Sequence, residues 1–347
     1  MKKIKFFDAT LRDGSHAIKH QLTEENIIDF CRYMDTTGVY AIVVGHGNGL
    51  GASSLQIGLS KLTMEEMLNA ARENLKTTKL GAYLIPGFGT IRDDIRPAIA
   101  AGVDLFKVGC HCTEADTTRE HIEYLANHNK EVYGVLMMYH MASVERVLEE
   151  AQKMQSYGAR GVILMDSAGA STPELVKRAV GTLSDGLGIE VGFHAHNNLG
   201  MAVANTYVAL KNGATIADGT IRGFGAGAGN CQLEALAALL YKEEIECHLD
   251  IFKMMDASEK VVKLLKKEDK GIDDISIVNG MAGTFSAFKE HVIKAAKEFD
   301  VDPRNVLLEL GRRKTVAGQE DMIIEVAQEL SRAADLRDES YFLSSLS

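Results

Sequence analysis

Short apolar runs alternate with longer amphipathic stretches along the first two thirds of the chain. The runs are rich in Val, Ile, Phe and Leu, and they span residues 4–9, 41–45, 79–85, 104–109, 132–138, 161–166, 190–194 and 215–219. Between them lie stretches with helical periodicity, for example residues 24–37, 64–76, 143–157 and 173–183, several of which begin at Ser or Thr as candidate N-caps. Strands that alternate with helices pair in parallel. The order of elements therefore predicts an α/β fold with a parallel sheet.

The eight strand–helix units predict a closed TIM (β/α)₈ barrel. The predicted strands are apolar almost throughout, as expected for strands that are buried on both faces. Because such a barrel usually takes ~250 residues, we expect the barrel of this 347-residue chain to close near residue 240. An open doubly wound sheet has the same alternation of strands and helices and is the alternative.

The pattern changes beyond Leu249. Four stretches there have helical periodicity, residues 252–267, 285–299, 303–310 and 319–333, and a charge-rich connection at 266–274 separates the first two. We therefore predict a catalytic barrel over residues 1–248 and an additional C-terminal helical domain over residues 249–347.

Charge and cysteine usage narrow the class of partner. The formal net charge is −10, which disfavours a nucleic-acid groove or an anionic membrane surface, because both attract clustered Lys and Arg. The five cysteines, at positions 31, 110, 112, 231 and 247, do not form the pattern of a disulfide framework. The N-terminus reaches Asp8 before an apolar run long enough for a signal peptide. We expect a cytoplasmic protein that binds small molecules or other proteins.

The loop after the first predicted strand combines three kinds of charged or titratable group. It reads Arg12-Asp13-Gly14-Ser15-His16, so that a cation, a carboxylate and an imidazole lie close together in the chain. In a TIM barrel, the active site lies at the carboxyl ends of the strands. A solvated Arg12–Asp13 pair would be the ordinary interpretation of an isolated string of this kind, but the position of the loop favours a catalytic role.

Two histidines follow the seventh predicted strand. His194 and His196 are two residues apart, and side chains with this spacing point to the same side of an extended segment. Such a pair binds a divalent metal when a carboxylate completes the set, and Asp13 is the natural third ligand. Without a thiolate, the set favours Mn²⁺, Mg²⁺ or Co²⁺ over structural zinc. The alternative is two buried histidines that donate to backbone carbonyls.

Cys110-His111-Cys112, after the fourth predicted strand, invites a competing interpretation as a zinc site. Thiolates and imidazole are good zinc ligands, but no second cysteine pair or HxxxH segment completes a tetrahedral set. We expect one cysteine to lie in the core and one to line the rim of the barrel.

Two glycine-rich loops, residues 45–51 and 223–230, resemble phosphate-binding loops. Neither matches the Walker pattern, and the first lacks the spacing of a dinucleotide-binding fingerprint. The second follows the eighth strand, where barrels often bind phosphate. The alternative, which we favour, is a tight loop whose backbone approaches a ligand or metal centre closely. Asp166 and Ser167, after the sixth strand, add a carboxylate and a hydroxyl to the rim, unless they serve only as helix caps.

Taken together, these motifs resemble those of the 4-hydroxy-2-oxovalerate aldolases. The resemblance spans the whole chain, and its motifs are residues 11–21 (LRDGSHAIKHQ), 45–51 (GHGNGLG), 111–116 (HCTEAD), 192–199 (GFHAHNNL), 225–230 (GAGAGN) and 310–323 (LGRRKTVAGQEDMI). The first and fourth motifs alone would indicate only the wider superfamily that includes isopropylmalate synthases and hydroxymethylglutaryl-CoA lyases. The last motif narrows the resemblance to the aldolases.

The resemblance implies a metal-dependent cleavage of a 4-hydroxy-2-oxoacid to pyruvate and an aldehyde. Asp13, His194 and His196 would hold the metal, Mn²⁺ with Mg²⁺ or Co²⁺ as alternatives, which acts as a Lewis acid on the 2-oxoacid. Arg12 would stabilise the pyruvate enolate, and His16 would take the proton from the C4 hydroxyl.

The resemblance further implies that Ser167 orients pyruvate and that Arg12 and His194 also contact the substrate. One departure concerns the proton donor. The family has a tyrosine from the C-terminal region that protonates the enolate carbon, but the corresponding stretch here has Met281 and Phe285. We consider Tyr139, after the fifth strand, as a surrogate donor. Asn48 is a second departure, because the family typically has Asp there.

The family's partner is an acylating aldehyde dehydrogenase that receives the aldehyde through the helical tail, and the resemblance also implies an oligomer. The tail has two alternative roles, to cap the barrel or to dimerise, since its amphipathic helices fit those roles equally well. Three other functions remain as alternatives: a related aldolase for another aldehyde or oxoacid, an acyl-CoA enzyme, for which no basic cluster marks a CoA site, and a non-catalytic partner protein.

Overall fold

The computed structural model describes residues 3–265 and 272–344, with side chains for residues 3–260 and 272–333. Eight parallel strands form a closed barrel in chain order, and β1 completes it by pairing with β8. The strands are β1 Lys5–Asp8, β2 Ala41–Val43, β3 Lys79–Leu84, β4 Leu105–His111, β5 Glu131–Met137, β6 Gly161–Asp166, β7 Glu190–Ala195 and β8 Ile216–Gly219. The predicted TIM barrel is confirmed, and the open doubly wound sheet was the wrong alternative.

Alternation along each strand divides the core into two layers. Phe7 and Tyr83 point into the barrel with Val135 and Ile163. Phe6 and its equivalents on the other strands pack outwards against the helices. Because both faces are buried, the strands read as continuous apolar runs, which explains why the sequence reveals them so clearly.

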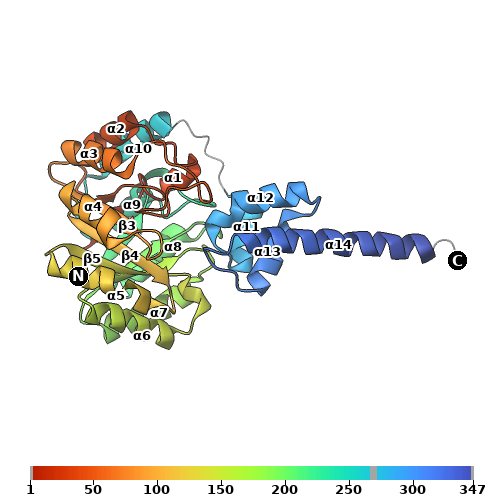
Figure 1. The fold of residues 1–347 in the computed structure, drawn as a ribbon. Helices are drawn as coiled ribbons and strands as arrows, with labels where there is room; N and C mark the ends of the chain where they lie inside the picture. The colour runs from red at the N-terminus through yellow and green to blue at the C-terminus, as the bar shows by residue number, and fades with distance from the viewer. Residues whose placement is uncertain (1–2, 266–271, 345–347) are drawn as a thin grey trace.

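Helices surround the barrel, as Figure 1 shows. They are α1 Gly14–Ala17, α2 Glu24–Met34, α3 Met64–Asn74, α4 Arg96–Ala100, α5 Arg119–Asn127, α6 Val144–Ser156, α7 Pro173–Gly186, α8 Ala202–Lys211 and α9 Leu233–Lys242, with a π-helical turn at Ile91–Ile95 and 3-10 turns at Ala115–Thr118, Tyr139–Met141 and Ile221–Gly223. Thr23 and Thr63 form capping boxes at α2 and α3, and Ser143 and Thr172 cap α6 and α7. The predicted Ser and Thr N-caps are therefore present.

The C-terminal helices form two groups. The first helix, α10 Ile251–Leu265, buries Met254 and Ala257 in the core of the barrel. The remaining helices share a core of their own (Figure 1); they are α11 Asp274–Ala282, α12 Lys289–Glu298, α13 Pro303–Arg312 and α14 Asp321–Ser344, with a 3-10 turn at Ser286–Phe288. We call α11–α14 the helical lobe. Helix α10, which follows the predicted boundary between residues 248 and 249, therefore packs with the barrel rather than with the helical lobe.

Hydrogen bonds attach the helical lobe to the loops at the carboxyl ends of β6 and β7. The backbone N–H of Ser286 donates to the carbonyl of Ser167 at 3.0 Å. Asn198 donates to the carbonyl of Ser276 and accepts from the hydroxyl of Ser286, at 3.2 and 3.0 Å. The lobe therefore covers one side of the barrel rim on which an active site is expected. Within the described residues, no helix is both long and apolar enough to cross a membrane.

Candidate metal centre and active-site cavity

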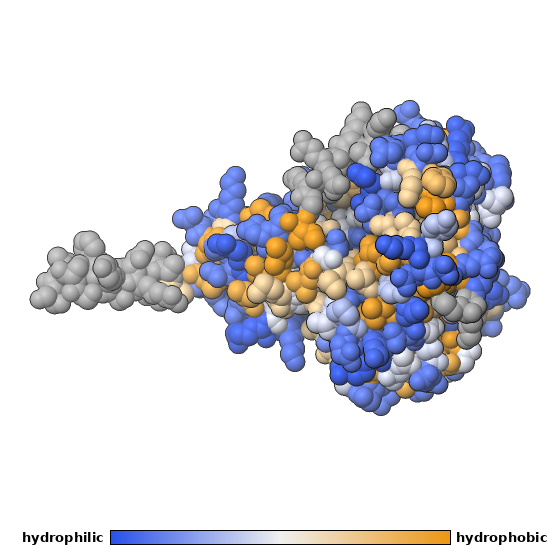
Figure 2. All heavy atoms as spheres, turned by 180° about the vertical axis from the view of Figure 1, so that it is seen from behind, coloured by the Kyte–Doolittle hydropathy of each residue, from blue (hydrophilic) through white to orange (hydrophobic). Residues whose placement is uncertain are grey.

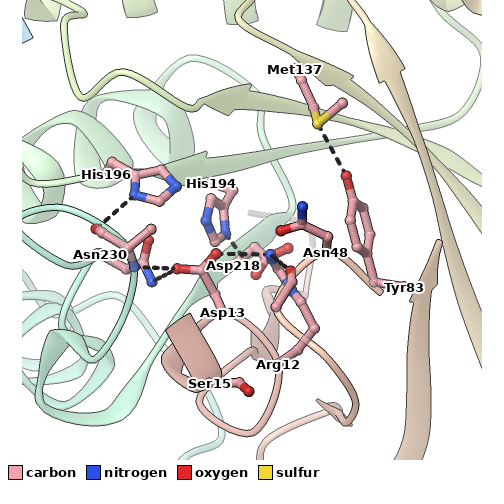
Figure 3. Close-up of polar contacts among 12 residues, drawn as sticks. Arg12, Asp13, Ser15, Asn48, Tyr83, Met137, His194, His196, Asp218 and Asn230 are labelled. Atoms are coloured by element: carbon pink, nitrogen blue, oxygen red, sulfur yellow. Dashed lines mark hydrogen bonds and ion pairs between the residues drawn. The ribbon is translucent and has the colours of Figure 1, made fainter. Parts of the chain in front are cut away.

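Asp13, His194 and His196 meet at the carboxyl end of the barrel (Figure 3). Asp13 comes from the loop after β1, and the two histidines come from the end of β7. One ligand atom from each of the three lies within 4.8 Å of the others, and all three side chains are buried. The structure thus brings together the carboxylate and the two imidazoles that the sequence predicted as a metal set.

The hydrogen bonds of the two histidines determine which ring nitrogen faces the centre. Nδ1 of His194 lies 3.0 Å from Oδ1 of Asp218, and Nδ1 of His196 lies 3.4 Å from the carbonyl of Ala226. Since both partners are acceptors, each Nδ1 carries the proton and each Nε2 keeps a lone pair. Nε2 of His194 is buried and has no hydrogen-bond partner. A divalent cation fits this arrangement, because it would satisfy an otherwise orphaned nitrogen.

Behind His194 lies a fully buried ion pair. Lys107 from β4 contacts Oδ2 of Asp218, the same carboxylate that holds His194 through its other oxygen. Burial alone would raise the pKa of Asp218, but the charge of Lys107 and the bond to His194 hold it below its usual range. The carboxylate therefore stays ionised and fixes the orientation of the imidazole. Sequence reasoning missed Lys107 and Asp218, although charged residues within apolar strands were a visible signal.

Asp13 is held by a shell of donors. Its Oδ2 accepts from Nδ2 of Asn230 at 2.6 Å and from the N–H of Ala226 at 3.2 Å, and its Oδ1 accepts from Arg12 at 2.8 Å. Burial would raise the pKa of Asp13, but Arg12 and the neighbouring histidines together hold it well below its usual range. An ionised carboxylate beside two imidazoles is the donor set expected for Mn²⁺, Mg²⁺ or a similar divalent ion.

The glycine-rich loop at residues 223–230 wraps closely around this centre. A Cβ at Gly225 would lie 2.4 Å from Oδ2 of Asp13 and 2.1 Å from Nδ2 of Asn230. The next residue, Ala226, binds Asp13 through its N–H and His196 through its carbonyl. The structure therefore supports the interpretation of this loop as one that brings backbone close to a metal centre.

Arg12 keeps part of its hydrogen-bonding capacity free. One terminal nitrogen donates to Asp13 and to the carbonyl of Gly47, and the guanidinium carbon lies 4.7 Å from the ring centre of Tyr83. Its Nε and other terminal nitrogen are buried without a hydrogen-bond partner. Buried guanidinium N–H groups of this kind are suited to an anionic oxygen.

His16 packs against the backbone of Gly47, where a Cβ would lie 2.3 Å from its Nε2. Burial lowers the pKa of His16, so that the imidazole is neutral near pH 7. Two further histidines shape the same loop: His20 accepts from the N–H of Gly47, and His46 accepts from the N–H of Asn48. Burial lowers the pKa of His20 to about 3 and that of His46 to about 4.

These groups open onto one cavity of about 360 Å³. Its inner lining includes Arg12, Asp13, His16, Tyr83 and His196. The cavity extends past further residues of the barrel loops and of the helical lobe, among them Asn48, His111, Glu114, Met137, Phe285, Val316 and Glu320. The lining therefore combines a cation, a neutral imidazole and two of the three residues of the metal set, Asp13 and His196. The third, His194, is fully buried and is not part of the lining.

Several predicted site residues lie elsewhere. Ser167 is buried and accepts from the N–H of Met138, and it is absent from the cavity lining. The hydroxyl of Tyr139 donates to Ser171 inside the core, so its position contradicts the suggestion that it is a surrogate proton donor. Phe285 does reach the cavity, whereas Met281 is 67% exposed.

The competing zinc site is not supported. Cys110 lines the cavity, while Cys112 is in the core and contacts the carbonyl of Met138. Within the described residues, the set of Asp13 and the two histidines is the only group of three or more His, Cys, Asp or Glu side chains placed to share a metal ion.

Comparisons with known proteins agree with this geometry. The HMGL-like family model matches residues 3–261, and the model of the DmpG-like communication domain matches residues 270–332. A 4-hydroxy-2-oxovalerate aldolase from Pectobacterium atrosepticum is 50% identical over 331 residues, which cover 95% of this chain and 96% of the relative. The aldolase of the same name from Spirochaeta aurantia is 50% identical over 323 residues, which cover 93% and 95%.

Solved structures with low sequence identity support the fold alone. The N-terminal domain of a putative aldolase from Bacteroides vulgatus has a TM-score of 0.72 at 22% identity, covering 84% of this chain and 97% of that one. The carboxyl transferase domain of Rhizobium etli pyruvate carboxylase, solved with pyruvate, has a TM-score of 0.81 at 17% identity, covering 96% and 61%.

Proposed function

Because this chain belongs to the family of 4-hydroxy-2-oxovalerate aldolases, we propose that it cleaves 4-hydroxy-2-oxopentanoate, or a close 4-hydroxy-2-oxoacid, to pyruvate and an aldehyde. The enzyme is then a carbon–carbon lyase. The observation that carries the proposal is the meeting of three features at one cavity: the buried metal set, of which Asp13 and His196 line the cavity, the free N–H groups of Arg12 and the neutral imidazole of His16.

Asp13, His194 and His196 would hold a divalent cation, for which we propose Mn²⁺, with Mg²⁺ or Co²⁺ as alternatives. The bound ion would supply Lewis acidity toward the oxygens of the 2-oxoacid. Asp218 keeps Nε2 of His194 turned toward the centre. Asn230 and Ala226 hold the Asp13 carboxylate in place without neutralising it.

We assign Arg12 to the enolate oxygen. The C3–C4 bond leaves its electrons on the pyruvate fragment, and a guanidinium with two nitrogens free to donate stabilises the charge that develops there. Contact with Asp13 and the ring of Tyr83 fixes the direction of the guanidinium before substrate arrives. Such preorganisation is what makes the interaction effective in the transition state.

We assign His16 to the C4 hydroxyl. It lines the cavity, and its lowered pKa leaves it neutral, so it can accept the hydroxyl proton as the C3–C4 bond breaks. Ser167 was also proposed to orient pyruvate. Because Ser167 is absent from the cavity lining and its hydroxyl accepts from the N–H of Met138, we propose instead that it positions the loop after β6 and, through its carbonyl, the helical lobe.

We further propose that the helical lobe docks an acylating aldehyde dehydrogenase, which would receive the aldehyde. Its match to a communication-domain model supports this partner. Figure 2 shows apolar side chains gathered on the lobe, and exposed apolar residues there include Ile277, Met281, Leu308 and Ile324. We propose an oligomer because of the same exposed apolar residues.

The five unpaired cysteines support the cytoplasmic location that we propose.

A second candidate is the same cleavage with a different aldehyde product. Polar side chains of the outer cavity, His111, Glu114 and Glu320, favour an aldehyde that carries polar groups. Rim loops change the substrate while the inner chemistry is kept. Profiling the reverse condensation of pyruvate with aldehydes of different length and polarity separates the two candidates.

The test is pyruvate release from 4-hydroxy-2-oxopentanoate after chelation and re-addition of Mn²⁺. We expect Mn²⁺ to restore activity in the wild type and in the control His128→Ala, which alters an exposed histidine away from the cavity. We expect His194→Ala to stay inactive. If the wild type releases no pyruvate, exchange of the pyruvate C3 protons decides: exchange indicates a different aldehyde, and no exchange refutes the aldolase function.

A further inference from the structure

Cleavage leaves an enolate whose carbon must take up a proton, and Phe285, a lobe residue that lines the cavity, has none to give. We propose that Tyr83 is the catalytic acid that donates this proton. The inference rests on the proposed function and adds a catalytic residue to it.

Tyr83 lies on β3 at the inner part of the cavity (Figure 3). Its ring stacks beside the guanidinium of Arg12, with 4.7 Å between the guanidinium carbon and the ring centre. Arg12 in turn contacts the metal ligand Asp13. A substrate whose oxygens face the free N–H groups of Arg12 would therefore lie beside the ring of this phenol.

The hydroxyl of Tyr83 is held only weakly. It donates to Sδ of Met137 at 3.2 Å, and a thioether is a poor acceptor. By contrast, two other tyrosines of the inner barrel layer donate to carboxylates: Tyr133 to Glu190 and Tyr40 to Glu131. Because Met137 lines the same cavity, a ligand there can replace the thioether as the partner of Tyr83.

The strand beside Tyr83 leaves room for this hydroxyl. A Cβ at Gly109 on β4 would lie only 2.3 Å from the hydroxyl oxygen of Tyr83. Gly109 also lines the cavity. The tyrosine and the glycine thus form a matched pair of positions, and a side chain at 109 would force the phenol out of its place.

The proton balance closes without another reagent. The electrons of the C3–C4 bond form the enolate, His16 accepts the proton of the C4 hydroxyl, and Tyr83 gives its phenolic proton to C3. The resulting phenolate is stabilised by the adjacent positive charge of Arg12. The proton held by His16 then returns to Tyr83 through cavity water or solvent. Burial raises the pKa of Tyr83, so the phenol is protonated before each turnover.

The test uses pyruvate alone, in D₂O with the Mn²⁺-loaded full chain, and follows exchange of the C3 protons by NMR. General acid catalysis contributes 10²–10⁴-fold, so we expect Tyr83→Phe to lower the exchange rate about 100-fold or more, with little change in the KM for pyruvate. The control Tyr133→Phe removes the hydroxyl of another tyrosine of the barrel interior, which bonds Glu190 and does not line the cavity. We expect it to exchange at the wild-type rate.

A rescue variant separates a chemical role from a structural one. Phe285 lines the cavity, so Phe285→Tyr in the Tyr83→Phe background restores a phenol there, and we expect exchange to recover at least tenfold. Normal exchange in Tyr83→Phe would overturn the proposal, as would a matching loss of Mn²⁺ affinity in that variant. Loss of exchange in Tyr139→Phe, with retention in Tyr83→Phe, would overturn it in favour of Tyr139. An inactive wild type would instead refute the proposed function.

Discussion

At the scale of single residues, the buried chain Lys107–Asp218–His194 is energetically costly to assemble. Two charges without solvent access are destabilising unless each is fully paired. Here Lys107 and His194 occupy the two oxygens of one carboxylate. In return, His194 is held in one tautomer and one orientation. Mutation of a residue that orients a metal ligand in this way typically lowers metal affinity by 10–100-fold.

We predict that Asp218→Asn weakens Mn²⁺ binding by roughly 10–100-fold. The amide keeps the shape of the side chain but loses the negative charge that holds His194 and neutralises Lys107. Isothermal titration with Mn²⁺ measures the effect, and circular dichroism checks that the variant is folded. Asp93→Asn, which alters an exposed ion pair, is the control. Equal affinity in both variants would show that Asp218 does not position the ligand.

A second buried carboxyl, Asp8, predicts a pH dependence of stability. Burial raises the pKa of Asp8 from its ordinary value of 3.8 to about 7. The folded state therefore keeps a proton that the unfolded state releases as the pH rises above about 4, and the free energy of unfolding falls until about pH 7.

Asp8→Asn imitates the protonated form, because an amide can keep the contacts with Thr10. We expect the stability of the variant relative to the wild type to increase between pH 4 and pH 7, by on the order of 4 kcal/mol for about three pK units. Above pH 7 the difference should level off. Urea unfolding of both metal-free proteins at several pH values measures it. A constant difference over this range would disprove the raised pKa.

At the scale of elements, the sequence predicts a strand or helix correctly where one physical signal dominates. All eight strands were predicted within about two residues, because burial on both faces leaves a continuous apolar run. Helix α11 was missed: Gly280 interrupts its apolar stretch, and its cap Asp273 looked like part of a charged loop. The predicted helix at 252–267 is present as α10, and its residues 266–267 lie outside the described part of the chain.

Some residues of the candidate site could likewise be predicted from the sequence, and others could not. Asp13, His194 and His196 could be predicted because motif spacing and strand ends are local properties. Asn230 and Tyr83 could not, since their roles depend on which strands and loops become neighbours in the closed barrel. Tyr139 illustrates the opposite error: the sequence places it at a strand end, but only the structure reveals that its ring turns into the core.

The close packing of the glycine-rich loop at residues 223–230 leads to a prediction about metal binding. We expect Gly225→Ala to weaken Mn²⁺ binding at least tenfold, because its Cβ would lie within 2.4 Å of Asp13 and Asn230 and must displace one of them. Equilibrium dialysis of Mn²⁺ measures this loss. Gly181→Ala is the control, since a Cβ there meets nothing within 4 Å. Unchanged affinity in Gly225→Ala would mean that the loop yields without disturbing the centre.

At the scale of the whole molecule, the helical lobe contributes to the active-site cavity. Phe285 and the loop at Val316–Glu320 line the cavity together with barrel residues. The lobe is anchored by few polar contacts, chiefly Asn198 with Ser276 and Ser286, and the backbone bond from Ser286 to Ser167. Any movement of a partner docked on the lobe would therefore be transmitted to the cavity wall through these contacts.

The hydrogen bonds of Asn198 to the helical lobe lead to a prediction about local stability. Asn198 is fully buried, and truncating it to Ala leaves the carbonyl of Ser276 and the hydroxyl of Ser286 without their partners, a loss of about 1–3 kcal/mol. We expect the cost to appear as local opening of the lobe rather than as loss of the metal centre. Hydrogen exchange should become faster in α11 and residues 284–288, while Mn²⁺ affinity stays within about twofold. Asn212→Ala, which removes only a contact within α8 and its C-cap, is the control. If exchange instead rises equally across the strands of the barrel, the lobe and barrel unfold as one unit, and the contacts of Asn198 are part of the global fold.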